Sequence, residues 1–142
     1  MEICPSPLNA TSFEVQGKHI ITALELSLDA QHCLSDGRGP GFRGKYTGSL
    51  HIAGAKIIHD GKRVIDILIG EKSIEKEKWY TVATSDYLHR GSGYESLANN
   101  INQTFLAEEI KDVIRIYASK KEFVERASVS RWIDQENHRL MM

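Results

Sequence analysis

Residues 11–15 alternate apolar and polar side chains, and residues 18–30 repeat apolar ones at the spacing of a helix. The first pattern predicts a short strand, and the second predicts an amphipathic helix. Gly17 stands between them, and because glycine weakens both kinds of element we expect the strand to end there. The apolar positions are Phe13, Val15, Ile21, Leu24 and Leu28.

Three further stretches have the composition of strands, at residues 49–59, 62–70 and 79–84. The Asp-Gly pair at residues 60–61 is a strong signal for a hairpin between the first two. The second stretch is almost continuously apolar, so we expect it to be covered on both faces. Glycines concentrated over residues 35–48 predict a loop before the first stretch.

The second half of the chain predicts another loop and another helix. Residues 85–94 are punctuated by glycine and predict the loop, whereas the last nine residues, 134–142, have the composition of a frayed tail. The order of all these elements indicates an α+β domain over residues 1–133. The stripe that predicts the helix consists of Leu106, Ile110, Val113 and Tyr117.

Composition narrows the class of protein. The chain has 142 residues and a net charge of -1, which suits one globular domain and gives no reason to expect a nucleic-acid or membrane partner. No apolar run approaches the roughly 20 residues of a membrane-spanning helix. Two cysteines, Cys4 and Cys33, are too few for a disulfide scaffold, and we expect free thiols. Free thiols favour a reducing compartment such as the cytoplasm, but a secreted or cell-surface parent stays open.

No complete catalytic constellation is visible in the sequence. None of the six histidines stands in a metal-ligand pattern, and neither a nucleophile elbow nor a phosphate-binding loop of the Walker type is present. We therefore expect no catalytic residue and no metal ligand in this chain.

Four motifs in order resemble the carboxy-terminal domain of the 5'-nucleotidase family. Residues 80–88 followed by 91–94 resemble the family's strand and the glycine-rich turn after it. Residues 48–60 resemble its hairpin. Residues 5–9 and 15–28 resemble the entry to its first strand and its first helix. The resemblance extends to the bifunctional UDP-sugar hydrolase/5'-nucleotidase and 2',3'-cyclic phosphodiesterase type.

This resemblance implies helices layered on mixed or antiparallel sheets, and a parent protein of two domains. An upstream metallophosphoesterase domain in cis would hold two divalent metal ions and perform the hydrolysis. The present domain would bind the substrate, a nucleotide or another phosphate ester, and would be inactive alone. It would bind no cofactor itself.

Carried over residue by residue, the resemblance implies a substrate site with two departures. Tyr87 corresponds to an aromatic residue that stacks on the base, and Asn9 to the family's asparagine. Ser49 stands where the family has the other stacking ring, the first of the two along the chain, and Ser92 stands in the turn where the family has a sugar-binding aspartate. Arg43, in the glycine-rich loop, is a candidate contact for an anionic group.

Each of these residues also has a plainer interpretation. Tyr87 could cap the core, Asn9 could bond to its own backbone, and Arg43 could be a solvated surface charge. We expect His89 on the surface. Packing positions are expected for Trp79, Tyr94 and Trp132.

Three functions remain open. The first is the substrate-binding part of a phosphohydrolase, and the Pro-rich start favours a fragment of this kind. The second is a stand-alone nucleotide-binding module, and the third is a structural module without a catalytic partner. Metal-binding motifs in the coding sequence upstream would distinguish the first from the others.

Overall fold

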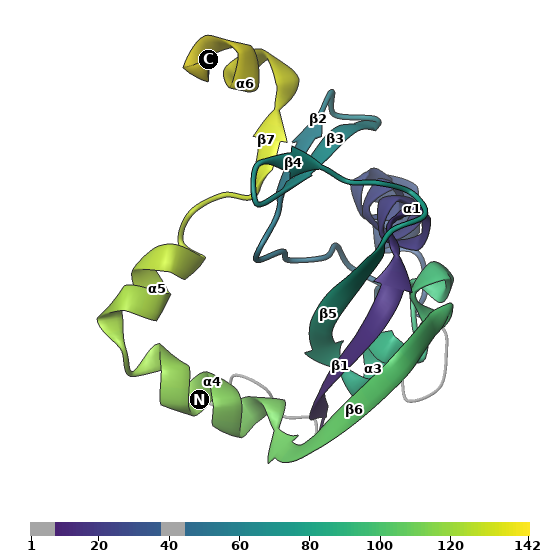
Figure 1. The fold of residues 1–142 in the computed structure, drawn as a ribbon, viewed down its shortest axis with the longest axis vertical. Helices are drawn as coiled ribbons and strands as arrows, with labels where there is room; N and C mark the ends of the chain where they lie inside the picture. Colours follow the sequence, from purple (N-terminus) through teal and green to yellow (C-terminus); the bar gives the residue numbers. More distant parts are fainter. Residues whose placement is uncertain (1–7, 38–44) are drawn as a thin grey trace.

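The structure is a computed structural model that describes residues 8–37 and 45–142. Its strands form two sheets (Figure 1). The antiparallel sheet has the order β5-β1-β6 and consists of β5 (Trp79–Ser85), β1 (Asn9–Gln16) and β6 (Asn100–Glu109). The mixed sheet has the order β4-β3-β2-β7 and consists of β4 (Lys72–Ser73), β3 (Val64–Ile69), β2 (Lys56–His59) and β7 (Trp132–Asp134).

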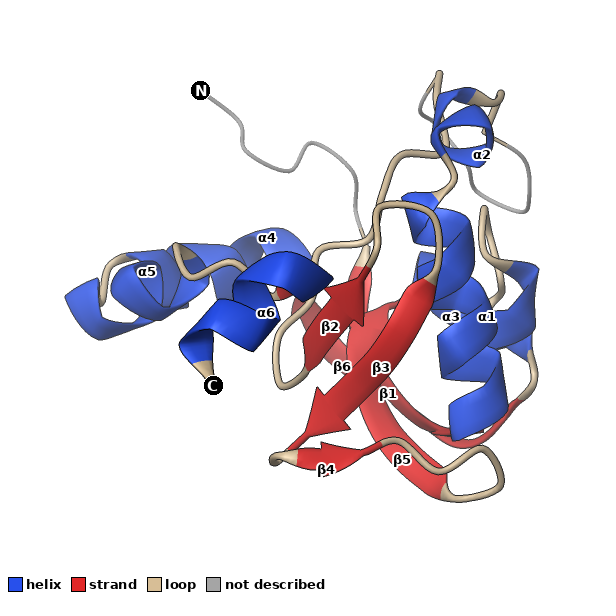
Figure 2. Ribbon diagram, turned by 90° about the horizontal axis from the view of Figure 1, so that it is seen from above, coloured by secondary structure: helices blue, strands red, loops and turns tan. Residues whose placement is uncertain are grey.

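Helices lie on both sides of these strands (Figure 2). On one side are α1 (Gly17–Leu28), α2 (Ala30–Leu34), α3 (Asp86–His89) and the short 3-10 helix η1 (Glu95–Ala98). On the other are α4 (Ile110–Ala118), α5 (Lys121–Ala127) and α6 (Gln135–Met141). The α+β fold class is therefore confirmed. Within the described ranges, none of the helices has both the length and the apolar composition to cross a membrane.

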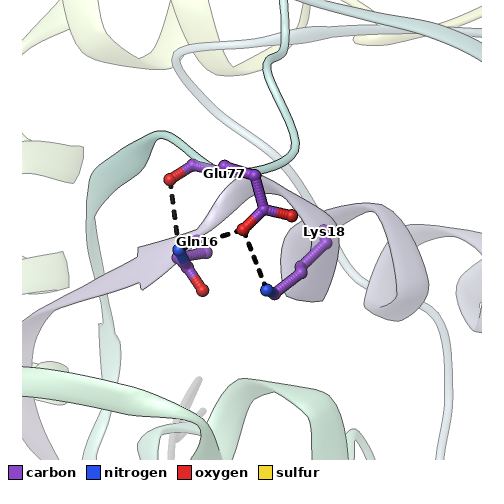
Figure 3. Close-up of polar contacts among 3 residues, drawn as sticks. All are labelled: Gln16, Lys18 and Glu77. Atoms are coloured by element: carbon purple, nitrogen blue, oxygen red, sulfur yellow. Dashed lines mark hydrogen bonds and ion pairs between the residues drawn. The ribbon is translucent and has the colours of Figure 1, made fainter.

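The junction between β1 and α1 follows the sequence prediction. Phe13 and Val15 are buried, and the helix begins at Gly17. A Cβ atom at Gly17 would lie 2.2 Å from the carbonyl oxygen of Glu75, so this position has no room for a side chain. Glu77 stabilises the junction from the segment before β5, as Figure 3 shows. Its carboxylate oxygen Oε2 accepts a hydrogen bond from the Lys18 ammonium group at 3.0 Å and forms an ion pair with it.

Two adjacent residues of helix α1 pack into two different hydrophobic clusters of the core. Ala23 packs in a cluster with Tyr94 and Leu97. Leu24 packs in a second cluster, with Ile57 of β2 and Ile67 of β3. The half-buried side chain of Leu50 contacts both clusters, and so the loop before β2 packs against the same helix.

The strand predicted over residues 49–59 is shorter than expected. Only Lys56–His59 forms β2, and Gly54, at a φ of +80°, interrupts the extended backbone before it. The hairpin is confirmed, but its turn spans four residues and not two. The Asp60 carboxylate accepts backbone hydrogen bonds from Lys62 at 2.9 Å and from Arg63 at 2.7 Å, which stabilises the longer turn.

Two burial predictions were wrong. In β3 only Ile67 is fully buried, where it packs with Leu24 of α1, and Ile65 is 45% exposed, so the strand is not covered along its length as predicted. Trp79, expected to pack, is 42% exposed at the start of β5. The prediction for Trp132 is confirmed, because this side chain packs on the second cluster and its Nε1 donates to the Leu50 carbonyl at 3.2 Å.

The helix predicted through Leu106 begins later than the stripe suggests. Residues 100–109 form β6, the edge strand paired with β1, and α4 starts at Ile110. Pairing with β1 determines the conformation here, whereas the exposed side chains of an edge strand give no clear alternation. Residues 85–94, expected to be a loop throughout, include α3, whose first turn is capped by Ser85 Oγ accepting from the Leu88 amide.

Residues 134–142, expected to be a frayed tail, begin with the last residue of β7 and contain α6. The Asp134 carboxylate caps α6 by accepting from the Glu136 amide at 2.9 Å, which is the usual role of aspartate at a helix start. Leu140 and Met141 remain exposed, so the helix adds little to the core. The domain boundary at residue 133 stays a prediction.

Tyr94 connects the glycine-rich turn to the loop before Ser49. Its side chain is 2% exposed, which confirms the packing prediction, and its hydroxyl donates to the Gly48 carbonyl at 2.6 Å. The His32 ring packs edge-on against it at a centroid distance of 5.2 Å. Burial raises the pKa of Tyr94 to about 12.

We expect Tyr94→Phe to lower the free energy of unfolding by about 1–3 kcal/mol, because the enclosed Gly48 carbonyl loses its donor. Urea denaturation measures this change. Tyr117→Phe is the matched control, since Tyr117 is 45% exposed, and its effect should stay within about 0.5 kcal/mol.

The same variant should change the alkaline limit of stability. An ordinary tyrosine has a pKa of 10.0, so between pH 10 and about 12 Tyr94 ionises in the unfolded chain before it does in the folded one. Stability therefore falls with rising pH over this window in the wild type and falls less in Tyr94→Phe. Equal alkaline losses in the two proteins would contradict the buried position of the hydroxyl.

Candidate functional site

Asn9 and Tyr87 lie at the same end of the antiparallel sheet. Ala10 of β1 pairs with Ser85, the last residue of β5, so Asn9 lies beside the start of α3, which carries Tyr87. Asn9 and Tyr87 come from opposite ends of the resemblance in sequence. The fold brings them into one neighbourhood because β1 and β5 are antiparallel.

The Asn9 side chain is oriented by β6. Its Nδ2 donates to the carbonyls of Leu106 at 3.2 Å and Ala107 at 3.4 Å, where the register of β1 and β6 shifts. The alternative that Asn9 bonds to its own backbone is therefore wrong. Its Oδ1 accepts no hydrogen bond from the part of the chain that the structure describes, and this oxygen is an available acceptor.

Tyr87 occupies the second position of α3 and is half-buried. Burial raises the pKa of its hydroxyl above the ordinary tyrosine value, so the side chain is neutral at physiological pH. The Tyr87 carbonyl accepts from the Ser92 amide at 3.4 Å, which connects the helix to the glycine-rich turn. The stacking role of Tyr87 stays a prediction.

The turn at residues 91–93 requires its glycines. Gly91 and Gly93 have φ values of +84° and +78°, which side chains other than glycine rarely adopt. A Cβ at Gly93 would also lie 2.9 Å from the Thr47 Cγ2 atom, so the turn and the loop before Ser49 are in close contact. Ser92, between the glycines, is 1% exposed and is enclosed by the fold.

Ser49 lies on the other side of this contact and is exposed. The preceding residue, Gly48, accepts from the Tyr94 hydroxyl and donates its amide to the Cys33 carbonyl at 2.9 Å. The loop is thus fixed both to the turn and to α2. Arg43 lies outside the described residues, and its candidate role stays a prediction.

A cavity of about 720 Å³ opens beside the turn. Its walls come from α2, the loop around Thr47, the turn and η1. The polar and charged side chains in these walls are His32, Ser35, Asp36, Thr47, Arg90 and Glu95. Arg90 lies between the two parts of the strand-and-turn motif and Glu95 directly follows it, so both stand beside the resemblance. Asp36 lies in the glycine-rich stretch at residues 35–48, and no motif of the resemblance marked it.

His89 is not a surface residue as expected. Its ring lies between Phe13 and Phe105, at centroid distances of 5.2 and 5.3 Å, and its Nδ1 is buried without a partner in the described part of the chain. The position of His89 on α3 turns it toward the antiparallel sheet, which the sequence pattern of a loop could not indicate.

The described residues include no group of three or more histidine, cysteine, aspartate or glutamate side chains that could hold a metal ion. Cys33 is a free thiol whose Sγ lies 3.4 Å from the Ser27 carbonyl, whereas Cys4 lies outside the described range. The side chains of this region offer hydrogen bonds, charge and ring contacts to a ligand.

Solved structures that share this fold include two 5'-nucleotidases and an NAD nucleotidase. The chain aligns with a putative 5'-nucleotidase from Staphylococcus aureus in complex with alpha-ketoglutarate at 15% identity and a TM-score of 0.63, covering 92% of this chain and 28% of that one. It aligns with a 5'-nucleotidase precursor from Thermus thermophilus at 15% identity and a TM-score of 0.58, covering 92% of this chain and 24% of that one. It aligns with the NAD nucleotidase of Haemophilus influenzae at 19% identity and a TM-score of 0.60, covering 92% of this chain and 23% of that one.

The chain thus spans about a quarter of the length of these solved proteins. No curated protein sequence matches it. The sequence profile of the 5'-nucleotidase, C-terminal domain, matches residues 1–99, which include β1, α1, both sides of the hairpin and the glycine-rich turn. With that match over most of its length, the chain belongs to the 5'-nucleotidase C-terminal domain family.

Proposed function

We propose that this domain binds the substrate of a 5'-nucleotidase-type phosphoric ester hydrolase and presents it to a metal-bearing catalytic domain in cis. The observation that carries the proposal is that three recognition elements belong to neighbouring segments, since β1 pairs with β5 beside the start of α3 and the glycine-rich turn directly follows α3. They are the available Oδ1 of Asn9, the half-buried ring of Tyr87 and the cavity beside the turn that follows it.

The nature of these groups supports a binding role rather than a catalytic one. An aromatic ring offers a face to any nucleobase, and a fixed amide oxygen accepts a hydrogen bond from a base or a sugar. The described residues offer no ligand set for the two-metal site that the family resemblance implies. The hydrolytic step accordingly belongs, in this proposal, to the other domain, whose metal ions would activate water and stabilise the phosphoryl group.

The substrate in this proposal is a nucleotide or another phosphate ester, and the protein is a hydrolase of nucleotide catabolism. We also propose that the complete protein belongs to the subgroup of bifunctional UDP-sugar hydrolases/5'-nucleotidases and 2',3'-cyclic phosphodiesterases. A stand-alone nucleotide-binding or structural module is the competing outcome. It would be identified by the absence of a catalytic domain in the complete protein.

Replacing Tyr87 by alanine should weaken nucleotide binding by about 1–3 kcal/mol, because one base–aromatic contact is lost. In the complete enzyme the effect should fall on KM rather than on kcat, since the ring does not touch the reacting phosphate in this proposal. Tyr117→Ala, which removes an exposed ring on α4, is the control. A folded Tyr87→Ala variant with unchanged KM for all nucleotides would assign Tyr87 to the core.

The 142-residue chain alone should not hydrolyse phosphate esters in the presence of manganese or zinc. The reason is that the described residues contain no cluster of metal ligands. A colorimetric assay of phosphate release from a nucleoside monophosphate checks this expectation. Turnover that depends on the added metal and disappears with a chelator would contradict the division of labour between the two domains.

Preference for adenosine monophosphate should be weak, because Ser49 has no π-face to form the second side of a base clamp. The complete enzyme would be assayed with nucleoside monophosphates, cyclic nucleotides and simple phosphate esters. We expect less than a hundredfold spread in kcat/KM between adenosine monophosphate and the other nucleotides. A larger preference would show that another ring takes the place of the missing one.

A further inference from the structure

Strand β5 has a free edge. In the sheet order β5-β1-β6 it pairs with β1 alone, so β5 and β6 are the outer strands on opposite sides of β1 (Figure 1). Within residues 8–37 and 45–142, the backbone of Tyr80–Thr84 forms no hydrogen bond outside this pairing. The amide and carbonyl groups on the outer side of β5 are therefore available to a further strand.

This edge borders an apolar cavity of about 670 Å³, which is separate from the cavity beside the glycine-rich turn. The consecutive residues Tyr80–Thr84 all line it. Successive side chains of a strand point to opposite faces of the sheet. Because neighbouring residues with opposite orientations line the same cavity, the cavity lies along the edge of β5 and not over one face.

The other walls of this cavity are apolar. They come from α1, the loop before β2, β3, α3 and η1, and they include Leu24 and Ile67, which pack together in the second core cluster. Among the described residues that line the cavity, none is an aspartate, glutamate, lysine or arginine. A phosphate group would find no cation in these walls, so the cavity does not suit the phosphate of the substrate.

The size of the cavity corresponds to one strand. The five residues Tyr80–Thr84 span about 16 Å at a rise of about 3.3 Å per residue, so a volume of about 670 Å³ along them has a cross-section of roughly 40 Å². One strand in a packed sheet occupies roughly 50 Å², since strands lie about 4.8 Å apart and stacked sheets about 10 Å apart. A second folded copy would bring its β1 beside its β5, and this width does not admit two strands.

The two faces of β5 determine the side chains of an added strand. Tyr80, Val82 and Thr84 are half-buried, whereas Thr81 and Ala83 are exposed. Because neighbouring strands share their faces, the added strand has apolar side chains on the buried face and polar ones on the exposed face. A small apolar molecule would leave the β5 backbone without partners. The free edge and the apolar walls together select an extended polypeptide.

We infer that an extended segment of the complete protein, from outside these 142 residues, adds to β5 as a fourth strand of the antiparallel sheet. This inference rests on the proposed function, which supplies a catalytic part of the same polypeptide. In the solved proteins that share this fold, roughly three quarters of the polypeptide lies outside the matching part. Because β5 leads directly into α3, the added strand would fix the catalytic part beside Tyr87.

The test is hydrogen–deuterium exchange, followed by mass spectrometry, of the complete protein and of the 142-residue chain. We expect residues 79–85 to exchange more slowly in the complete protein, by about tenfold or more, because their outer amides gain partners. Residues 100–109 are the internal control, since they form β6, the other outer strand. Their exchange should be the same in both proteins.

The variant Ala53→Trp should remove this protection from the complete protein. Ala53 is an exposed residue of the cavity wall, and an indole ring there would occupy the space of the added strand. Ala118→Trp, at the exposed end of α4 and outside the cavity, is the matched control and should keep the full protection. Circular dichroism checks that both variants fold.

Equal exchange of residues 79–85 in the two proteins overturns the inference, and so does equal slowing of residues 100–109, which would reflect general stabilisation. A folded Ala53→Trp variant that keeps the protection also overturns it. Protection that appears only with rising protein concentration would assign the strand to a second copy and overturns the source in cis.

Each of these results leaves the proposed function intact if the complete protein hydrolyses nucleotides. A complete protein without a catalytic domain overturns the proposed function, and the inferred strand falls with it. Slow exchange confined to residues 79–85, at every protein concentration and lost in Ala53→Trp, supports the strand.

Discussion

The arrangement of the candidate site depends on one buried side chain, Tyr94. It is the last residue of the glycine-rich turn, and its ring fills the cluster under α1 while its hydroxyl bonds to the Gly48 carbonyl at 2.6 Å. This single contact joins segments that are 46 residues apart in sequence. Together with the hydrogen bond from His32 to the Gly93 carbonyl, it fixes the loop at residues 45–49 relative to the turn at residues 91–93, and both segments form walls of the cavity.

Helix α1 provides the support for this contact. Its adjacent residues Ala23 and Leu24 pack into different clusters, one under the turn and one on the mixed sheet. The turn and the loop before Ser49 are therefore connected to the mixed sheet through this helix. The antiparallel pairing of β1 with β5 then brings Asn9 to the same end of the sheet as Tyr87. Recognition groups from distant motifs meet because of these two packing relations, and not because of their spacing in sequence.

The sequence predicted the elements whose burial is periodic. Phe13 and Val15 marked β1, and the stripe through Leu24 marked α1, because each element buries one face. The prediction for residues 100–109 was wrong for the opposite reason, because an edge strand with exposed side chains shows no periodic burial. Its Leu106 has the helical spacing to Ile110 by coincidence. Family motifs located Asn9, Tyr87 and the turn.

Tertiary structure was needed for the rest of the site. Asp36 and Glu95 lie in no motif of the resemblance, and only the fold brings them to the cavity that Gly91 and Gly93 line.

The most direct test of the central claim is a map of where a nucleotide binds on this chain. Backbone amide signals would be followed by NMR during titration with uridine monophosphate and adenosine monophosphate. The account predicts saturable shifts that concentrate on Asn9, Tyr87, the turn at residues 91–93 and Thr47. Saturable shifts confined to other surfaces, such as α4 and α5, or no shifts at millimolar nucleotide, would contradict the assignment of this end of the sheet as the substrate site.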